Sequence, residues 1–158
     1  MRIVRRDGSL CAELNTDHVG NLTGALLYEA DPAGAVLDGV GLSGAELGGA
    51  NLRDASLQAA DLYWAGCAKT DFTRANLRGA DFRGAVMTKA VLRDTILDGA
   101  NFGLDNLGGR TQLQGADLSG ATVQGACFDG ALYDDATVFP DKFDPLKRGM
   151  VRVPGGSP

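Results

Sequence analysis

The chain has 158 residues, of which 44% are hydrophobic and 22% charged, and its formal net charge is −5. This length allows one domain with little beyond a single core. The acidic balance disfavours direct binding of nucleic acid, whose phosphates repel an acidic surface, and no apolar run is long enough to span a membrane.

The N-terminal segment 1–14 predicts a β-hairpin. Arg2 to Arg5 and Leu10 to Leu14 flank the dipeptide Asp7-Gly8, and Asp-Gly between apolar-containing runs favours a tight turn. We expect residues 1–19, hairpin and linker, to cap the segment that follows. The only histidine, His18, lies in this linker with no evident catalytic or metal-binding partners, so we expect a surface or cap residue.

From residue 20 onward a five-residue pattern repeats. A small residue, usually Ala, is followed by a polar residue, a bulky Leu or Phe, and two further positions, as in Ala50-Asn51-Leu52 and Ala80-Asp81-Phe82. A period of five fits neither a helix nor a strand, so the chain must turn a corner in every repeat.

The small and the bulky side chains are expected to point inward, and the polar and corner side chains outward. Glycine is frequent at the last corner position because it adopts positive φ at little cost. Where that position holds Lys69, Arg74, Lys89 or Asp94, we expect a different turn type. The predicted core ladder includes Leu52, Leu62, Phe72, Leu77, Phe82 and Phe102.

The pattern A-[DN]-[LF]-x-x, repeated about two dozen times, resembles the pentapeptide-repeat family. The resemblance implies an all-β fold: a right-handed quadrilateral parallel β-helix, or solenoid, with four repeats in each coil. About six coils are expected over residues 20–140.

The repeat frame is interrupted near Arg110. One extra residue shifts the frame, which resumes at Leu113 and continues to Tyr133 and Val138. In the first frame Asp105 falls in an inward alanine place, where an unpaired carboxylate is costly to bury. We therefore expect residues 103–112 to bulge outward as a loop.

Residues 141–158 are predicted to form a C-terminal cap and a disordered tail. Phe139 and Phe143 follow the last inward residue, Val138, and are expected to cover the open core of the final coil. Asp144-Pro145 is typical of an N-cap and first-turn proline of a short helical turn, and residues 154–158 are expected to be disordered.

The three cysteines favour a reducing compartment. Cys67 falls in an inward place, Cys127 in an outward place and Cys11 in the hairpin, so no pair is placed to form a disulfide. No apolar signal segment follows Met1. We expect a cytoplasmic protein.

No catalytic, metal-binding or cofactor site is predicted. Residues 39–44 match the dinucleotide fingerprint GxGxxG, but both flanks are five-residue repeats instead of a strand and a helix. A possible interaction patch consists of Tyr63, Trp64 and Arg83. Tyr63 and Trp64 fill both corner places of one repeat, and Arg83 is expected one coil above Tyr63, where a cation–π contact contributes about 0.5–1 kcal/mol.

Two functions are consistent with the sequence. The first is a non-enzymatic scaffold or protein-interaction module, a monomer or weak dimer with an unknown protein partner and no small-molecule substrate. The alternative, implied by the family resemblance, is a DNA mimic that binds a type II topoisomerase, DNA gyrase, and protects it from quinolones. The acidic N-terminal third favours the alternative, whereas the arginine-rich centre, the modest net charge and the lack of a large inserted loop disfavour it.

Overall fold

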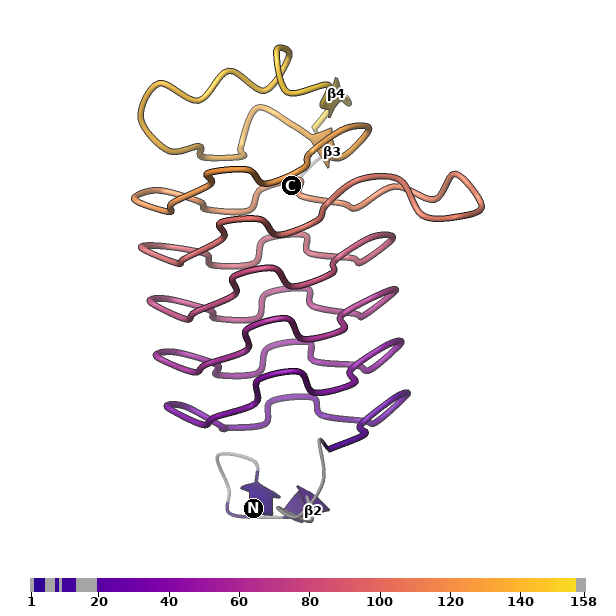
Figure 1. Ribbon diagram of the computed structural model, residues 1–158, viewed down its shortest axis with the longest axis vertical. Coiled ribbons are helices and arrows are strands. Elements are labelled where there is room, and N and C mark those ends of the chain that lie inside the picture. The colour runs from indigo at the N-terminus through magenta and orange to yellow at the C-terminus, as the bar shows by residue number, and fades with distance from the viewer. Residues whose placement is uncertain (1, 5–7, 9, 14–19, 156–158) are drawn as a thin grey trace.

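The computed structural model describes residues 2–4, 8, 10–13 and 20–155. From residue 20 the chain winds into a stack of similar coils, a β-helix, with the N-terminal segment at one end and the C-terminal segment at the other (Figure 1). Three predicted features lie outside the described residues: the turn residue Asp7, the linker residue His18 and the last three residues of the tail.

The predicted N-terminal hairpin is present. Strand β1 (Arg2–Val4) pairs antiparallel with β2 (Leu10–Glu13), with Arg2 opposite Glu13. The register shifts between Ile3 and Val4, and Gly8 in the connection has a positive φ of 83°.

Parallel bridges between successive coils set the register of the β-helix. Asn21 pairs with Gly41 and Gly41 with Asp61, so bridge partners lie 20 residues apart and each coil contains four repeats. Backbone hydrogen bonds accompany every bridge. The Leu22 amide donates to the Gly41 carbonyl oxygen at 2.7 Å, and the Gly41 amide donates to the Gly20 carbonyl oxygen at 3.1 Å. The backbone groups that the chain buries are thereby paired.

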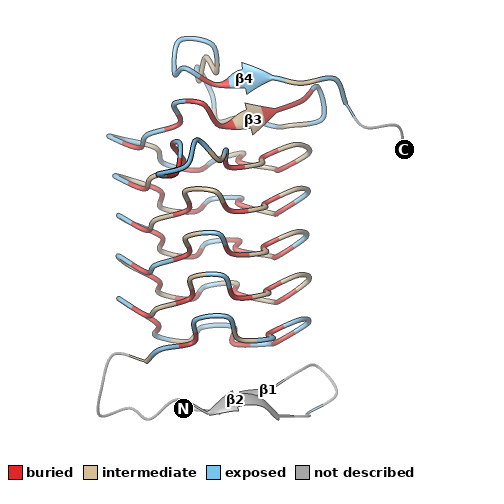
Figure 2. Ribbon diagram, turned by 90° about the vertical axis from the view of Figure 1, so that its right-hand side faces the viewer, coloured by how far each residue is buried: buried red, intermediate tan, exposed pale blue. Residues whose placement is uncertain are grey.

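The interior is filled by the bulky and small residues of each repeat, and buried positions recur along every coil (Figure 2). Each of the predicted ladder residues is at most 1% exposed. Threonine replaces alanine in some small places, where its hydroxyl group would be costly to bury without a partner. These hydroxyls donate to carbonyl oxygens of the chain: Thr70 to Leu47 at 2.7 Å, Thr95 to Leu92 at 2.6 Å and Thr111 to Phe82 at 2.8 Å.

The prediction of a different turn at corners without glycine is wrong. The φ angles of Lys69 and Arg74 are 59° and 57°, close to the 66° of Gly79. This left-handed conformation costs a non-glycine residue roughly 1–2 kcal/mol. The stack holds it because each corner amide reaches the coil above: the Lys69 amide donates to the Thr88 carbonyl oxygen at 3.0 Å, and the Arg74 amide to the Arg93 carbonyl oxygen at 2.9 Å.

The interruption near Arg110 is longer than the single residue predicted. Val86 pairs with Gln112, a separation of 26 residues instead of 20, so six residues are inserted. Leu107, which the repeat frame places inward, is 84% exposed. Thr111 takes the small place before Leu113, and the predicted outward loop projects from the side of the stack (Figure 1).

A second frame shift near the C-terminus corrects the assignment of Val138. Asp117 pairs with Val138, a separation of 21 residues, so one further residue is inserted after Tyr133. Val138 therefore lies in an outward place and is 47% exposed, and Phe139 takes the inward place that the sequence frame gave to Val138.

The C-terminal segment packs on the last coil. Strand β3 (Leu132–Tyr133) pairs parallel with β4 (Val151–Arg152). The rings of Phe139 and Phe143 stack with centroids 5.0 Å apart; Phe139 meets Tyr133 edge-on at 5.5 Å and Phe143 meets Phe128 edge-on at 5.1 Å.

Asp144 organises the turn that follows Phe143. Its Oδ1 accepts hydrogen bonds from the Leu146 amide at 3.1 Å and the Lys147 amide at 3.2 Å, the pairing expected of an N-cap. Residues 145–149 form turns and no regular helix.

Candidate functional site

Several kinds of site are missing from the described part of the chain. Among residues 2–4, 8, 10–13 and 20–155, no group of three or more His, Cys, Asp or Glu side chains is placed to hold a metal ion. The same residues form no helix that is long and apolar enough to cross a membrane. Gly39 and Gly44, from the GxGxxG match, have φ angles of 65° and 64° and are ordinary corner residues between bridges.

The three residues of the predicted interaction patch lie together on two adjacent coils. The rings of Tyr63 and Trp64 stack at 6.2 Å between centroids with an interplanar angle of 22°. The Arg83 guanidinium carbon lies 5.6 Å from the centre of the Tyr63 ring. Tyr63 is half-buried, whereas the Trp64 side chain is 53% exposed.

Arg83 is held in place by Asp81. Its Nε donates to both carboxylate oxygens at 3.0 and 3.1 Å, and its Nη2 donates to Oδ2 at 2.6 Å. Burial raises the pKa of Asp81, but the bonds from Arg83 outweigh burial and keep that pKa below its usual value. The Arg83 side chain therefore has a defined orientation at the edge of the patch.

The inserted loop is tied to the patch by one carboxylate. Asp105 Oδ1 accepts the amides of Leu107 at 2.7 Å and Gly109 at 2.6 Å, and Oδ2 accepts the Trp64 indole N–H at 2.6 Å. Asp105 is only 6% exposed, and burial raises its pKa, but the bonds it accepts have the larger effect and lower the pKa overall.

Two glycines make the Trp64–Asp105 bond possible. The Trp64 ring crosses the next corner at Gly84, where a Cβ atom would lie 2.5 Å from Trp64 Cδ1. A Cβ atom at Gly109 would lie 2.1 Å from Asp105 Oδ2. Any larger residue at either position displaces the indole or the carboxylate.

The opposite side of the loop is fastened to the following coil. Arg110 Nη1 donates to the Gly130 carbonyl oxygen at 2.8 Å, and a Cβ atom at Gly130 would lie 2.5 Å from Leu104 Cδ2. Anchored on both sides, the loop still leaves Leu104 41% and Leu107 84% exposed.

A hollow of about 320 Å³ lies between the loop and the patch. Its polar walls are Asp61, Tyr63, Asp81, Arg83 and Asn106, with Ala59, Ala60 and Gly79 completing the lining. We call Asp61, Tyr63, Trp64, Arg83 and residues 104–109 together the corner–loop surface. It combines a shallow polar hollow with exposed apolar groups.

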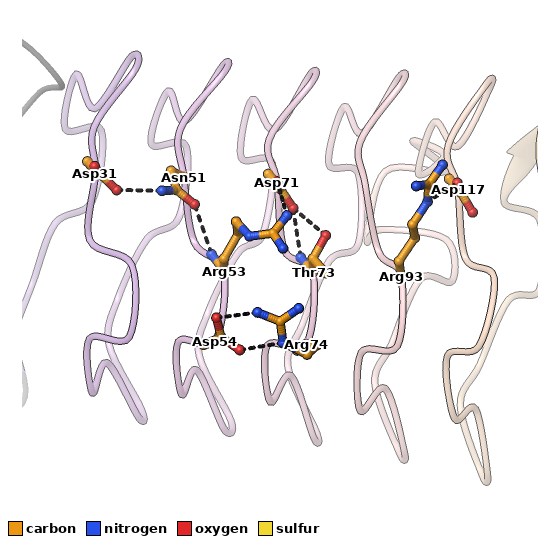
Figure 3. Close-up of polar contacts among 9 residues, drawn as sticks. All are labelled: Asp31, Asn51, Arg53, Asp54, Asp71, Thr73, Arg74, Arg93 and Asp117. Atoms are coloured by element: carbon orange, nitrogen blue, oxygen red, sulfur yellow. Dashed lines mark hydrogen bonds and ion pairs between the residues drawn. The ribbon is translucent and has the colours of Figure 1, made fainter.

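On the coils from Arg53 to Asp117, several acidic and basic side chains form ion pairs (Figure 3). Arg53 pairs with Asp71 at 2.9 Å, Arg93 with Asp117 at 2.5 Å, and Arg74 reaches both oxygens of Asp54 at 2.7 Å. Water screens ion pairs near the surface, so these pairs contribute little to stability. They also neutralise part of the acidic surface of the middle coils, where Arg53 faces Asp71 and Arg93 faces Asp117.

Sequence reasoning identified the aromatic patch and the loop but missed the bond that joins them. Asp105 and Trp64 are 41 residues apart, and no period of the repeat relates them. The sequence does contain a signal: Asp105 falls in an alanine place and is followed by Gly108 and Gly109. This combination indicates a carboxylate that accepts hydrogen bonds from the backbone amides of the loop that follows it.

Comparison with known proteins agrees with the repeat geometry. The family model "Pentapeptide repeats" matches in eight copies, over residues 21–54, 37–65, 67–103 and 109–132. The gap between the last two matches, residues 104–108, falls in the inserted loop. No curated protein matches the chain.

Several solved structures are similar. A pentapeptide repeat protein from Nostoc PCC 7120, alr5209, is 34% identical, with 75% of this chain and 84% of that chain covered and a TM-score of 0.38. HetL from Nostoc sp. strain PCC 7120, involved in heterocyst differentiation regulation, is 30% identical, with 87% of this chain and 60% of that chain covered and a TM-score of 0.42. Full-length QnrB1, a plasmid-mediated fluoroquinolone resistance protein, is 17% identical, with 78% of this chain and 83% of that chain covered and a TM-score of 0.42.

Proposed function

The chain belongs to the pentapeptide-repeat family, and on this premise we propose that it is a non-enzymatic scaffold whose corner–loop surface binds a protein partner. The observation that carries the proposal is the Trp64 side chain, 53% exposed and held at a defined position by Asp105. Exposed tryptophans are among the residues that contribute most to protein–protein binding.

The rigidity of the surface supports a binding role. Trp64 is fixed by the Asp105 carboxylate and Arg83 by Asp81, while Arg110 fastens the loop from its other side. Side chains that are ordered before binding lose less conformational entropy when a partner arrives, and that lower cost raises affinity. Leu107, 84% exposed beside this fixed framework, adds apolar surface that a partner would bury.

Other expectations are part of the same proposal. The coils wind right-handed around a quadrilateral section, the hairpin and the segment after Phe139 cap the two ends, and the protein acts in the cytoplasm as a monomer or weak dimer. Cys67 is a free, buried cysteine, and burial raises the pKa of its thiol and leaves it unreactive.

The test is capture of the partner by immobilised protein from an extract of the native cell, followed by calorimetry with the purified partner. We expect Trp64→Ala and Leu107→Ser to weaken binding about tenfold or more. Leu146→Ser is the matched control, because Leu146 is also a largely exposed leucine, 69%, but lies in the C-terminal segment. A partner that binds both variants as tightly as the control would disprove the role of this surface.

Topoisomerase binding is the alternative function. Steering toward a DNA-binding enzyme requires a surface of one sign, and the ion pairs of Arg53, Arg74 and Arg93 interrupt the carboxylates in the middle coils of this rod. We therefore expect the protein to leave quinolone inhibition of gyrase supercoiling unchanged. Restored supercoiling at micromolar protein would establish the alternative.

A further inference from the structure

We propose that the hollow of the corner–loop surface receives an arginine or lysine side chain of the protein partner. The inference rests on the proposed function and adds the chemistry of the contact. It follows from the unequal charges in the hollow, from its size and from the apolar groups beside it.

The charges of the hollow do not cancel. Two carboxylates, Asp61 and Asp81, and one guanidinium, Arg83, line it. Arg83 is committed to Asp81 through three contacts of 2.6 to 3.1 Å. Asp61 is exposed and accepts the Tyr63 amide at 3.0 Å through Oδ1. Among the ion pairs formed by the described residues, Asp61 takes part in none. A cation entering the hollow therefore meets an available carboxylate, and an anion meets net repulsion.

The hollow has room for one long side chain. At about 320 Å³ it lies at the lower end of the range of roughly 300–1,000 Å³ typical of small-molecule sites. Its walls suit a long cationic side chain, because Ala59, Ala60 and the Tyr63 ring offer apolar surface to the methylene groups while Asp61 and Asn106 meet the charged end.

The surroundings favour a protein over a free cation. Tyr63 lines the hollow and stacks on the exposed Trp64, and Asn106 lines it directly before the exposed Leu107. A polar pocket flanked by exposed aromatic and aliphatic groups matches the composition of protein–protein interfaces. Two carboxylates alone would not indicate a protein side chain. The exposed apolar groups of Trp64 and Leu107 beside the hollow favour one.

The test is an NMR titration of the full chain with N-acetyl-arginine-N-methylamide, and with the uncharged citrulline analogue in parallel. We expect saturable shifts of the backbone amides of Asp61, Tyr63 and Asn106 with the arginine compound only, weakened about tenfold by Asp61→Asn. An asparagine retains an oxygen that can accept the Tyr63 amide, so the fold is preserved. Asp31→Asn serves as the control and should bind like the parent, because Asp31 is also exposed but contacts Asn51, at 2.6 Å, and does not line the hollow.

The result that overturns the inference is distinct from the failure of the proposed function. Equal shifts with both compounds, shifts spread over the whole acidic surface, or full binding by Asp61→Asn would show that the hollow does not select a cation. If a partner were nevertheless captured through Trp64 and Leu107, the proposed binding function would be supported. Only the proposal that an arginine or lysine of the partner enters the hollow would be wrong.

Discussion

The indole N–H of Trp64 donates a 2.6 Å hydrogen bond to the carboxylate of Asp105, a residue 41 positions later and in the inserted loop. The same carboxylate accepts two amides of the loop, from Leu107 and Gly109. Loop conformation and tryptophan orientation are therefore coupled through one side chain. Since Trp64 is the chain's single tryptophan, its fluorescence reports on the loop.

Replacing Asp105 by alanine should release both Trp64 and the loop. We expect the emission of Trp64 to shift to longer wavelength and acrylamide to quench it more strongly, because the ring loses its only fixed polar contact in the loop. The melting temperature should change little, since the loop lies outside the coil-to-coil bridges. Unchanged emission would show that Asp105 does not hold Trp64 in solution.

Gly84→Ala should have the same optical effect for a different reason. The added Cβ would lie 2.5 Å from Trp64 Cδ1, so the indole must move away from Asp105. Gly99→Ala is a matched control: Gly99 has a similar φ, 69° against 72°, but nothing lies within 4 Å of its added Cβ. Both variants bear the cost of a left-handed alanine, and only Gly84→Ala should alter Trp64 fluorescence.

Neighbouring residues of one repeat should respond oppositely to the same substitution. Ala75 is fully buried, so Ala75→Leu overpacks the interior and should destabilise the protein by about 1–3 kcal/mol. Asn76, the next residue, lies in an outward place, and Asn76→Leu should change the unfolding free energy by about 0.5 kcal/mol or less. Chemical denaturation of the two variants tests this, and similar losses would contradict the inward and outward assignment.

The repeat made most of the fold predictable, because inward and outward places follow from residue size at a fixed period. Prediction failed where the period does not apply. Leu107 and Val138 both match the bulky position of the sequence repeat, yet inserted residues place both side chains outward. The length of an insertion depends on which residue pairs with the neighbouring coil, and the repeat does not specify this pairing. The turn at Lys69 differs from the expected one for a related reason: a hydrogen bond to the next coil overrides the local preference of a non-glycine residue for negative φ.

The corrected frame at the C-terminus can be tested with adjacent residues. Phe139 packs against Tyr133 and Phe143, so Phe139→Ala should cost about 1–3 kcal/mol, less than for a fully buried phenylalanine. Val138 is 47% exposed, and Val138→Ala should cost about 0.5 kcal/mol or less. If thermal melts rank the two variants in the reverse order, the frame read from the sequence would be the right one.

Acid should destabilise the rod through carboxylates such as Asp71. Burial raises the pKa of Asp71, but bonds from Thr73 and Arg53 outweigh it and keep that pKa below the usual 3.8. A carboxyl group whose pKa is lowered by folding stabilises the folded state above its unfolded pKa, and this contribution is lost as the pH falls through the folded pKa. We expect the melting temperature to be steady between pH 7 and 5 and to fall below about pH 4, with a shallower fall in Asp71→Asn. Identical acid profiles would exclude a contribution from Asp71.

The rings of Phe82, Phe102 and Phe128 form a column, with centroids 5.0 and 4.8 Å apart and planes within 7° of parallel. These separations are close to the distance of about 4.8 Å between neighbouring strands, so a ring at this place fits equally well on the coil below and the coil above. A duplicated 20-residue unit could join such a column without disturbing its neighbours, which makes the length of the molecule adjustable in whole coils by gene duplication. The column of parallel rings ends at Phe128, because the next ring, that of Phe143, is turned 77° to it. Length and termination are therefore encoded in separate parts of the chain, and one can change while the other is kept.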